Sequence, residues 1–133
     1  MAIYTNLPVY KATYSLLLDV SRMMPDLPRD ARYTIGQEMR TSIMKILIYI
    51  YRANRTRRKV HLIGLMREFL LEVQVYVRLL NDMKCISEKK YVHLMELTSD
   101  MSKQLAAWEK SEINRNSDGL KDCQGGNVSG QGF

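Results

Sequence analysis

The stretch that decides the fold is residues 60–85, VHLIGLMREFLLEVQVYVRLLNDMKC. Its apolar residues recur three and four positions apart, which is typical of an amphipathic α-helix with one buried face. At a rise of 1.5 Å per residue, such a helix would be about 39 Å long. We expect its core-facing residues to be Leu62, Met66, Phe69, Val73, Tyr76, Leu80 and Met83.

Three more segments share this spacing, and we expect helices over about 6–24, 32–54 and 87–111. The first has a proline in its first turn and ends at Pro25 and Pro28, since proline cannot continue a helix. The last begins with a serine, which is a good N-cap. The expected core-facing residues of the three are Tyr10, Tyr14, Leu17, Met24; Ile35, Met39, Ile43, Ile46, Leu47, Ile50; and Tyr91, Leu94, Thr98, Met101, Leu105, Trp108.

Four helices of similar length joined by short connectors predict an all-α fold, an antiparallel up-down-up-down four-helix bundle. We expect this bundle to occupy residues 1–111 as a single domain. Residues 112–133 hold five of the seven glycines and few apolar residues. This composition predicts a flexible C-terminal tail.

The formal net charge of +6 is concentrated in one part of the chain. Residues 32–59 carry eight basic residues against the single acidic residue Glu38, whereas the rest of the chain is nearly balanced. A local positive field of this kind suits a polyanion such as RNA or DNA. Such a run can also be only a solvated helix end that compensates the helix dipole. The candidate nucleic-acid-binding residues are Arg40, Lys45, Arg52, Arg55, Arg57, Arg58 and Lys59.

A second apolar stripe lies on the helix expected over 60–85, opposite the core-facing residues and flanked by Glu68 and Glu72. The preceding helix repeats the pattern, with Met44 also lying away from the core. Single exposed apolar residues are ordinary, but two stripes on consecutive helices predict a surface for self-association. The candidate oligomer-interface residues are Ile48, Tyr51, Leu71, Val75 and Leu79.

The sequence contains no pattern typical of a catalytic site, so we expect a protein that is not an enzyme and has no cofactor. His61 and His93 lie on different helices without neighbouring ligands, and a zinc site needs three or four. Glycine-rich phosphate loops and nucleophile motifs are absent. The longest apolar run, 46–51, is far shorter than a membrane span, and residues 1–11 lack the basic and apolar pattern of a secretory signal, so we expect neither feature. With only two cysteines, we expect a cytoplasmic protein without a membrane partner.

Five segments resemble a family of small bacterial four-helix bundles. They are LPVYKATYSLLLDV (7–20), YTIGQEM (33–39), IYIYRANRTR (48–57), RLLNDMKCIS (78–87) and SKQLAAWEKS (102–111). The family includes the accessory variability proteins of diversity-generating retroelements and the proteins encoded by intervening sequences in large-subunit ribosomal RNA genes. The YRAN segment with its basic extension, and QLAAWEKS, resemble the retroelement branch most.

The resemblance implies a homo-oligomeric ring, a pentamer, with a positively charged surface. In the retroelement it implies binding to the reverse transcriptase and to nucleic acid during mutagenic cDNA synthesis. Two alternatives stay open: a protein-interaction bundle whose basic segment docks an acidic partner, and a member of the ribosomal intervening-sequence branch with no retroelement role.

Overall fold

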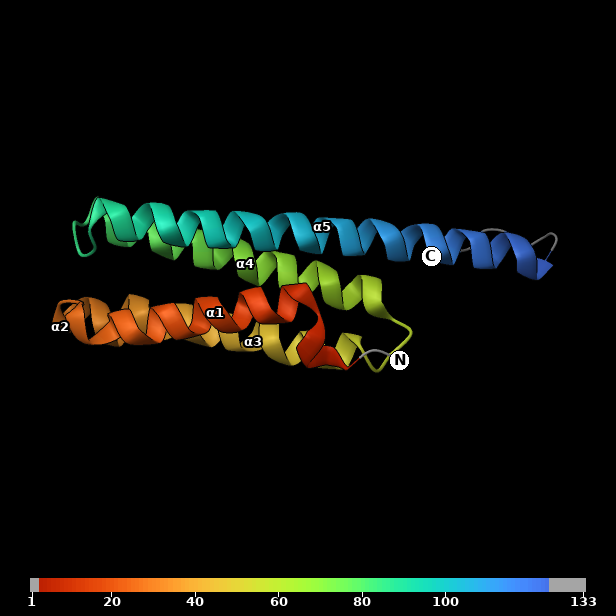
Figure 1. Ribbon diagram of the computed structural model, residues 1–133, viewed down its shortest axis with the longest axis horizontal. Coiled ribbons are helices and arrows are strands. Elements are labelled where there is room, and N and C mark those ends of the chain that lie inside the picture. Colours follow the sequence, from red (N-terminus) through yellow and green to blue (C-terminus); the bar gives the residue numbers. More distant parts are fainter. Residues whose placement is uncertain (1–2, 125–133) are drawn as a thin grey trace.

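The computed structural model describes residues 3–124, with side chains described up to residue 117. It confirms a helical bundle with four long helices, which run antiparallel in sequence order (Figure 1). In Figure 1, α4 and α5 form one layer, and α1 and α3 form the other. The long helices are α1 (Pro8–Met23), α3 (Gln37–Ala53), α4 (Lys59–Asp82) and α5 (Glu88–Gln124). The short elements are η1 (Tyr4–Asn6), η2 (Met24–Asp26), α2 (Arg29–Ala31) and the π-helical turn η3 (Arg32–Gly36).

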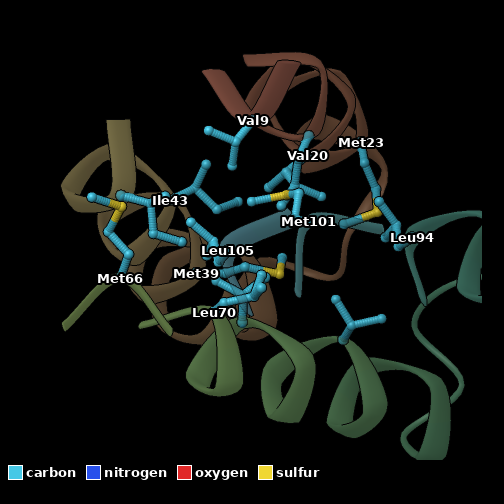
Figure 2. Close-up of a cluster of buried hydrophobic side chains, with 14 of the residues drawn as sticks. Val9, Val20, Met23, Met39, Ile43, Met66, Leu70, Leu94, Met101 and Leu105 are labelled. Carbon is cyan, nitrogen blue, oxygen red and sulfur yellow. The ribbon is translucent and has the colours of Figure 1, made fainter. Parts of the chain in front are cut away.

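The core is a continuous set of aliphatic and methionine side chains contributed by all four long helices (Figure 2). On α3 and α5 the helical spacing predicted the buried face well. Met39, Ile43 and Ile50 are buried on α3, and Leu94 and Leu105 on α5. The flexible thioethers of several methionines fill the irregular space between the layers.

On the first helix the prediction is right at Met24, which is buried directly after α1, and is off by one residue elsewhere, since Tyr10 and Leu17 are only partly buried and Tyr14 is exposed. Val9, Thr13, Leu16, Val20 and Met23 form the buried face, and each lies one position away from, or between, the residues predicted for it. Thr13 is accommodated in the core because its hydroxyl donates a hydrogen bond to the carbonyl of Val9. The burial of Thr13 therefore leaves its hydroxyl with a hydrogen-bond partner.

On α4 the prediction is right at Met66, Val73 and Leu80 and wrong at Met83, which is exposed. The remaining fully buried positions are Ile63, Leu70 and Val77, each one residue after a predicted position. The predicted residues Leu62, Phe69 and Tyr76 are partly buried against the core. One residue step turns a helix by about 100°, and α4 is rotated so that the Phe69 and Tyr76 rings lie toward α3 instead of at the centre of the core.

Helix α5 extends beyond the end expected near residue 111 and continues to Gln124, past the ends of the other helices (Figure 1). No proline interrupts residues 111–124, and the one glycine among them costs only about 1 kcal/mol relative to alanine. Residues 125–133, the rest of the tail predicted to be flexible, lie outside the described residues.

The reversal between α1 and α3 is held by one arginine. The Arg32 guanidinium donates hydrogen bonds to the carbonyls of Met24, Pro25 and Leu27, at 3.2, 3.0 and 3.1 Å. Gly36 permits close packing here, since a Cβ at this position would lie 2.5 Å from the Met24 sulfur. One cation of the basic segment is therefore used to build the fold.

The reversal between α4 and α5 is closed by backbone geometry and capping. At the end of α4, Lys84 has φ 60°, and the amides of Lys84 and Cys85 bond back to Asn81 and Leu80, which is a Schellman motif. Ser87 caps α5 as predicted, because its hydroxyl accepts the Lys90 amide at 3.1 Å. Among the described helices, none combines the length and the apolar character needed to cross a membrane.

Candidate functional site

An open groove of about 560 Å³ runs along the outward face of α3. We call it the α3 groove. Three of the predicted nucleic-acid-binding residues, Arg40, Lys45 and Arg52, lie on it. The remaining lining residues are Gln37, Thr41, Met44, Ile48 and Tyr49. The structure thus places three residues predicted to bind nucleic acid in the same groove as Ile48, which was predicted to lie in the oligomer interface.

Aromatic rings orient two of these cations. The Lys45 ammonium lies 5.2 Å from the centre of the Phe69 ring, and the Arg52 guanidinium lies 5.5 Å from that of Tyr49. The two rings are themselves 5.6 Å apart, across the contact between α3 and α4. Cation–π contacts position a charge without neutralising it, so both groups keep their full electrostatic field.

The connector between α3 and α4 (residues 54–58) carries three more of the predicted cations. Arg55 donates a 3.0 Å hydrogen bond to the Tyr51 hydroxyl and lies over the same ring. Arg57 and Arg58 are exposed. Because the connector follows α3 directly, these three arginines extend the charge of the α3 groove to one end of the bundle (Figure 1).

Lys59 has a structural position that sequence reasoning did not anticipate. Its ammonium donates hydrogen bonds to the carbonyls of Ala53 and Thr56, both at 2.7 Å. These contacts tie the end of α3 to the start of α4. The Lys59 charge is therefore engaged with the backbone, unlike the charges of its neighbours in the connector.

Across the side chains described, none of the seven predicted cations forms an ion pair with a carboxylate. The ion pairs are Arg67–Glu109, His93–Asp19 and Arg115–Glu112. At the α3–α4 contact, burial raises the pKa of the Tyr76 hydroxyl, and the carboxylates of Glu38 and Glu72 raise it further. Glu72 accepts a hydrogen bond from Ser42 at 3.1 Å. The excess positive charge on α3 and the connector is thus not compensated locally.

The predicted oligomer-interface residues all have exposed side chains, with exposed fractions between 38% and 62%. Leu71, Val75 and Leu79 follow one another on α4, opposite its buried face. Ile48 lies in the α3 groove, whereas Tyr51 contacts the Tyr4 ring at 5.0 Å. The predicted stripe on α3 is therefore divided between the α3 groove and an aromatic cluster beside α1.

That aromatic cluster contains residues that the sequence analysis assigned to the core. Tyr10 and Tyr14 lie on α1, and with Tyr4 and Tyr51 they form a row of neighbouring rings. The spacing of Tyr10 and Tyr14, four residues apart, places them on one face of a helix but does not say which face. Tyr4 precedes the first predicted helix, so no periodic pattern points to it.

No group of three or more metal-ligating side chains occurs in the part of the chain that the structure describes. A family model described as bAvd-like matches residues 9–112. The chain belongs to the bAvd-like family. bAvd is the Bordetella phage accessory variability determinant protein of diversity-generating retroelements. The resemblance found in the sequence is thereby confirmed, while no curated protein matches the chain.

The bAvd-like match includes nearly all of α1, the whole of α3 and α4, and α5 as far as residue 112. The α3 groove and the connector thus both lie within the region that defines membership. The family suggests an accessory protein of a diversity-generating retroelement.

Proposed function

We propose that this bAvd-like protein is a non-enzymatic nucleic-acid-binding accessory protein of a diversity-generating retroelement, which partners the reverse transcriptase in mutagenic cDNA synthesis. The observation that carries the proposal is the set of cations on α3 and the connector that no carboxylate pairs among the described side chains. An accessory role is in keeping with family membership.

Unpaired cations on one surface favour a polyanion for a physical reason. Each phosphate that they neutralise releases condensed counterions, so binding is strong at low salt and tolerant of sequence. Five guanidinium or ammonium groups with exposed side chains, Lys45, Arg52, Arg55, Arg57 and Arg58, are available for this contact. Arg40 adds a sixth at the other end of the α3 groove.

The proposal includes self-association into a ring. The family resemblance implies that this ring is a pentamer. Exposed apolar side chains lie on both α3 and α4, in different electrostatic surroundings. The α4 stripe has the exposed carboxylates Glu68 and Glu72 on one side and the exposed Arg67 and Arg78 on the other, whereas the α3 groove is lined by cations alone among its charged residues. Contact between the α3 face of one copy and the α4 face of the next would set the cations of the α3 groove against Glu68 and Glu72 and bury apolar area, and it would leave the connector arginines for nucleic acid. A ring would repeat the connector arginines once per subunit and so increase avidity for a long strand.

Oligonucleotide binding tests the first part of the proposal. We expect the affinity for a single-stranded RNA or DNA to fall at least about tenfold between about 50 and 200 mM salt. Replacing Arg55, Arg57 and Arg58 with Gln should weaken binding and reduce the salt dependence. The matched control replaces Lys89, Lys103 and Lys110, three exposed lysines of α5, with Gln. No binding at low salt, or equal losses in both variants, would contradict the proposal and leave a protein-interaction bundle.

Particle mass tests the second part. The protomer is 15.5 kDa, and light scattering should report a multiple of this mass for the wild type. Val75→Glu with Leu79→Glu should give smaller particles, because two charges would be buried at the contact. Val92→Glu with Ile113→Glu, at comparably exposed positions on α5, is the control and should leave the mass unchanged. A wild type that is a monomer at micromolar concentration would contradict self-association.

A further inference from the structure

Four tyrosine rings form a continuous row from α3 to α1, which we call the tyrosine ladder. The ring centres of Tyr51 and Tyr4 are 5.0 Å apart, and those of Tyr4 and Tyr10 are 5.3 Å apart, both in edge-to-face contact. Tyr10 and Tyr14 follow at 6.3 Å, with ring planes only 12° from parallel. Half of the eight tyrosines of the chain are thus gathered in one place.

The ladder is joined to the cationic surface at one end. The Arg55 guanidinium lies 5.3 Å from the centre of the Tyr51 ring and donates a hydrogen bond to its hydroxyl. Arg57 and Arg58 follow in the connector. A strand held by these arginines at its phosphates would have the aromatic row directly beside it.

Packing explains part of the ladder but not all of it. Tyr4 and Tyr10 are partly buried and hold η1 against the bundle. Tyr14, at the far end, is 49% exposed, and its ring contact is to Tyr10. A tyrosine that served only to cover the core would not need to hold its ring parallel to a neighbour at half exposure.

We infer that the tyrosine ladder is a stacking platform for the bases of single-stranded nucleic acid, with Arg55 and the connector arginines on the adjacent phosphates. This inference rests on the proposed function and adds the class of nucleic acid that the surface takes. Exposed aromatic rings beside cations bind single strands without regard to sequence, because every base has a stacking face. In a duplex the faces of the bases are already occupied, so a platform of this kind selects single strands.

Comparison of a normal with an abasic oligonucleotide separates stacking from charge. The two probes are oligo(dT) and an abasic deoxyribose-phosphate strand of equal length and phosphate count. We expect oligo(dT) to bind about tenfold or more tightly, since one stacked base contributes on the order of 5- to 100-fold. Tyr14→Leu should remove most of this preference without changing the salt dependence, whereas Tyr14→Phe, which keeps the ring, should retain it.

Tyr33→Leu is the matched control. Tyr33 is also exposed and lies 5.9 Å from a guanidinium, that of Arg32, but it is not one of the four ladder rings. We expect this variant to bind both strands as the wild type does. Equal binding of the two strands by the wild type, or equal losses in Tyr14→Leu and Tyr33→Leu, would overturn the platform and leave the proposed charge-based binding intact. Failure of both strands to bind at low salt would overturn the proposed function as well.

Discussion

Two arginines of α4 and α5 are paired with carboxylates, whereas two cations on the outward face of α3 lie against aromatic rings. Arg67 of α4 pairs with Glu109 of α5, and Arg115 of α5 pairs with Glu112. Lys45 and Arg52 of α3 instead contact Phe69 and Tyr49. A paired cation has its field cancelled at short range, while a cation over a ring keeps it. The two kinds of contact therefore differ in how much positive field they leave for an anionic partner.

The basic segment itself contains a second kind of cation. Arg32 and Lys59 bond to backbone carbonyls at the two ends of the segment, so they stabilise reversals of the chain. Composition alone counts them with the residues of the α3 groove and the connector. The following changes separate these backbone-bonded cations from an exposed cation of the connector and from a cation paired with a carboxylate.

The largest effect on stability is expected for Arg32→Met. The substitution leaves three carbonyls of the α1–α3 reversal without their donor, and hydrogen bonds to charged groups contribute more than neutral ones. We expect the free energy of unfolding in urea to fall by about 2–3 kcal/mol. Arg29→Met, at an exposed neighbouring position, should change it little. A larger loss of oligonucleotide affinity than of stability would assign Arg32 to the binding surface instead.

A smaller loss is expected for Lys59→Met, about 1–2 kcal/mol, because the carbonyls of Ala53 and Thr56 lose a charged donor. The comparison variant is Arg57→Met, two residues earlier and exposed. We expect Lys59→Met to lower the melting temperature and leave oligonucleotide affinity nearly unchanged. Arg57→Met should do the reverse, and the same response in both variants would remove the distinction between them.

The smallest effect is expected for the ion pair between Arg67 and Glu109. The Arg67 side chain is 44% exposed, so water screens its attraction to the Glu109 carboxylate. A double-mutant cycle with Arg67→Gln and Glu109→Gln should give a coupling energy of about 0.2–1 kcal/mol. Neither variant should alter nucleic-acid binding. A strong decrease in affinity for Arg67→Gln alone would show that pairing does not separate structural from functional cations.

Much of the candidate site could be predicted from the sequence because its signals are local. The clustering of Arg52, Arg55, Arg57 and Arg58 is visible without a fold. The exposure of Leu71, Val75 and Leu79 followed from their position opposite the core stripe, and the structure places them so. The tyrosine ladder could not be predicted, since Tyr4, Tyr14 and Tyr51 come from three separate elements.

The sequence by itself determined that four amphipathic helices form a bundle and that its positive charge gathers in one segment, because both properties depend on residues within a turn or two of each other. Only the tertiary structure decided the rotation of α1 and α4 about their axes. A rotation of about 100° is one residue step, and it moves one residue out of the core and its neighbour in the sequence into it. It also decided the partner of each cation. Whether an arginine or lysine meets a carbonyl, a ring or a carboxylate depends on distances between helices, and these are set by the packing of the whole core.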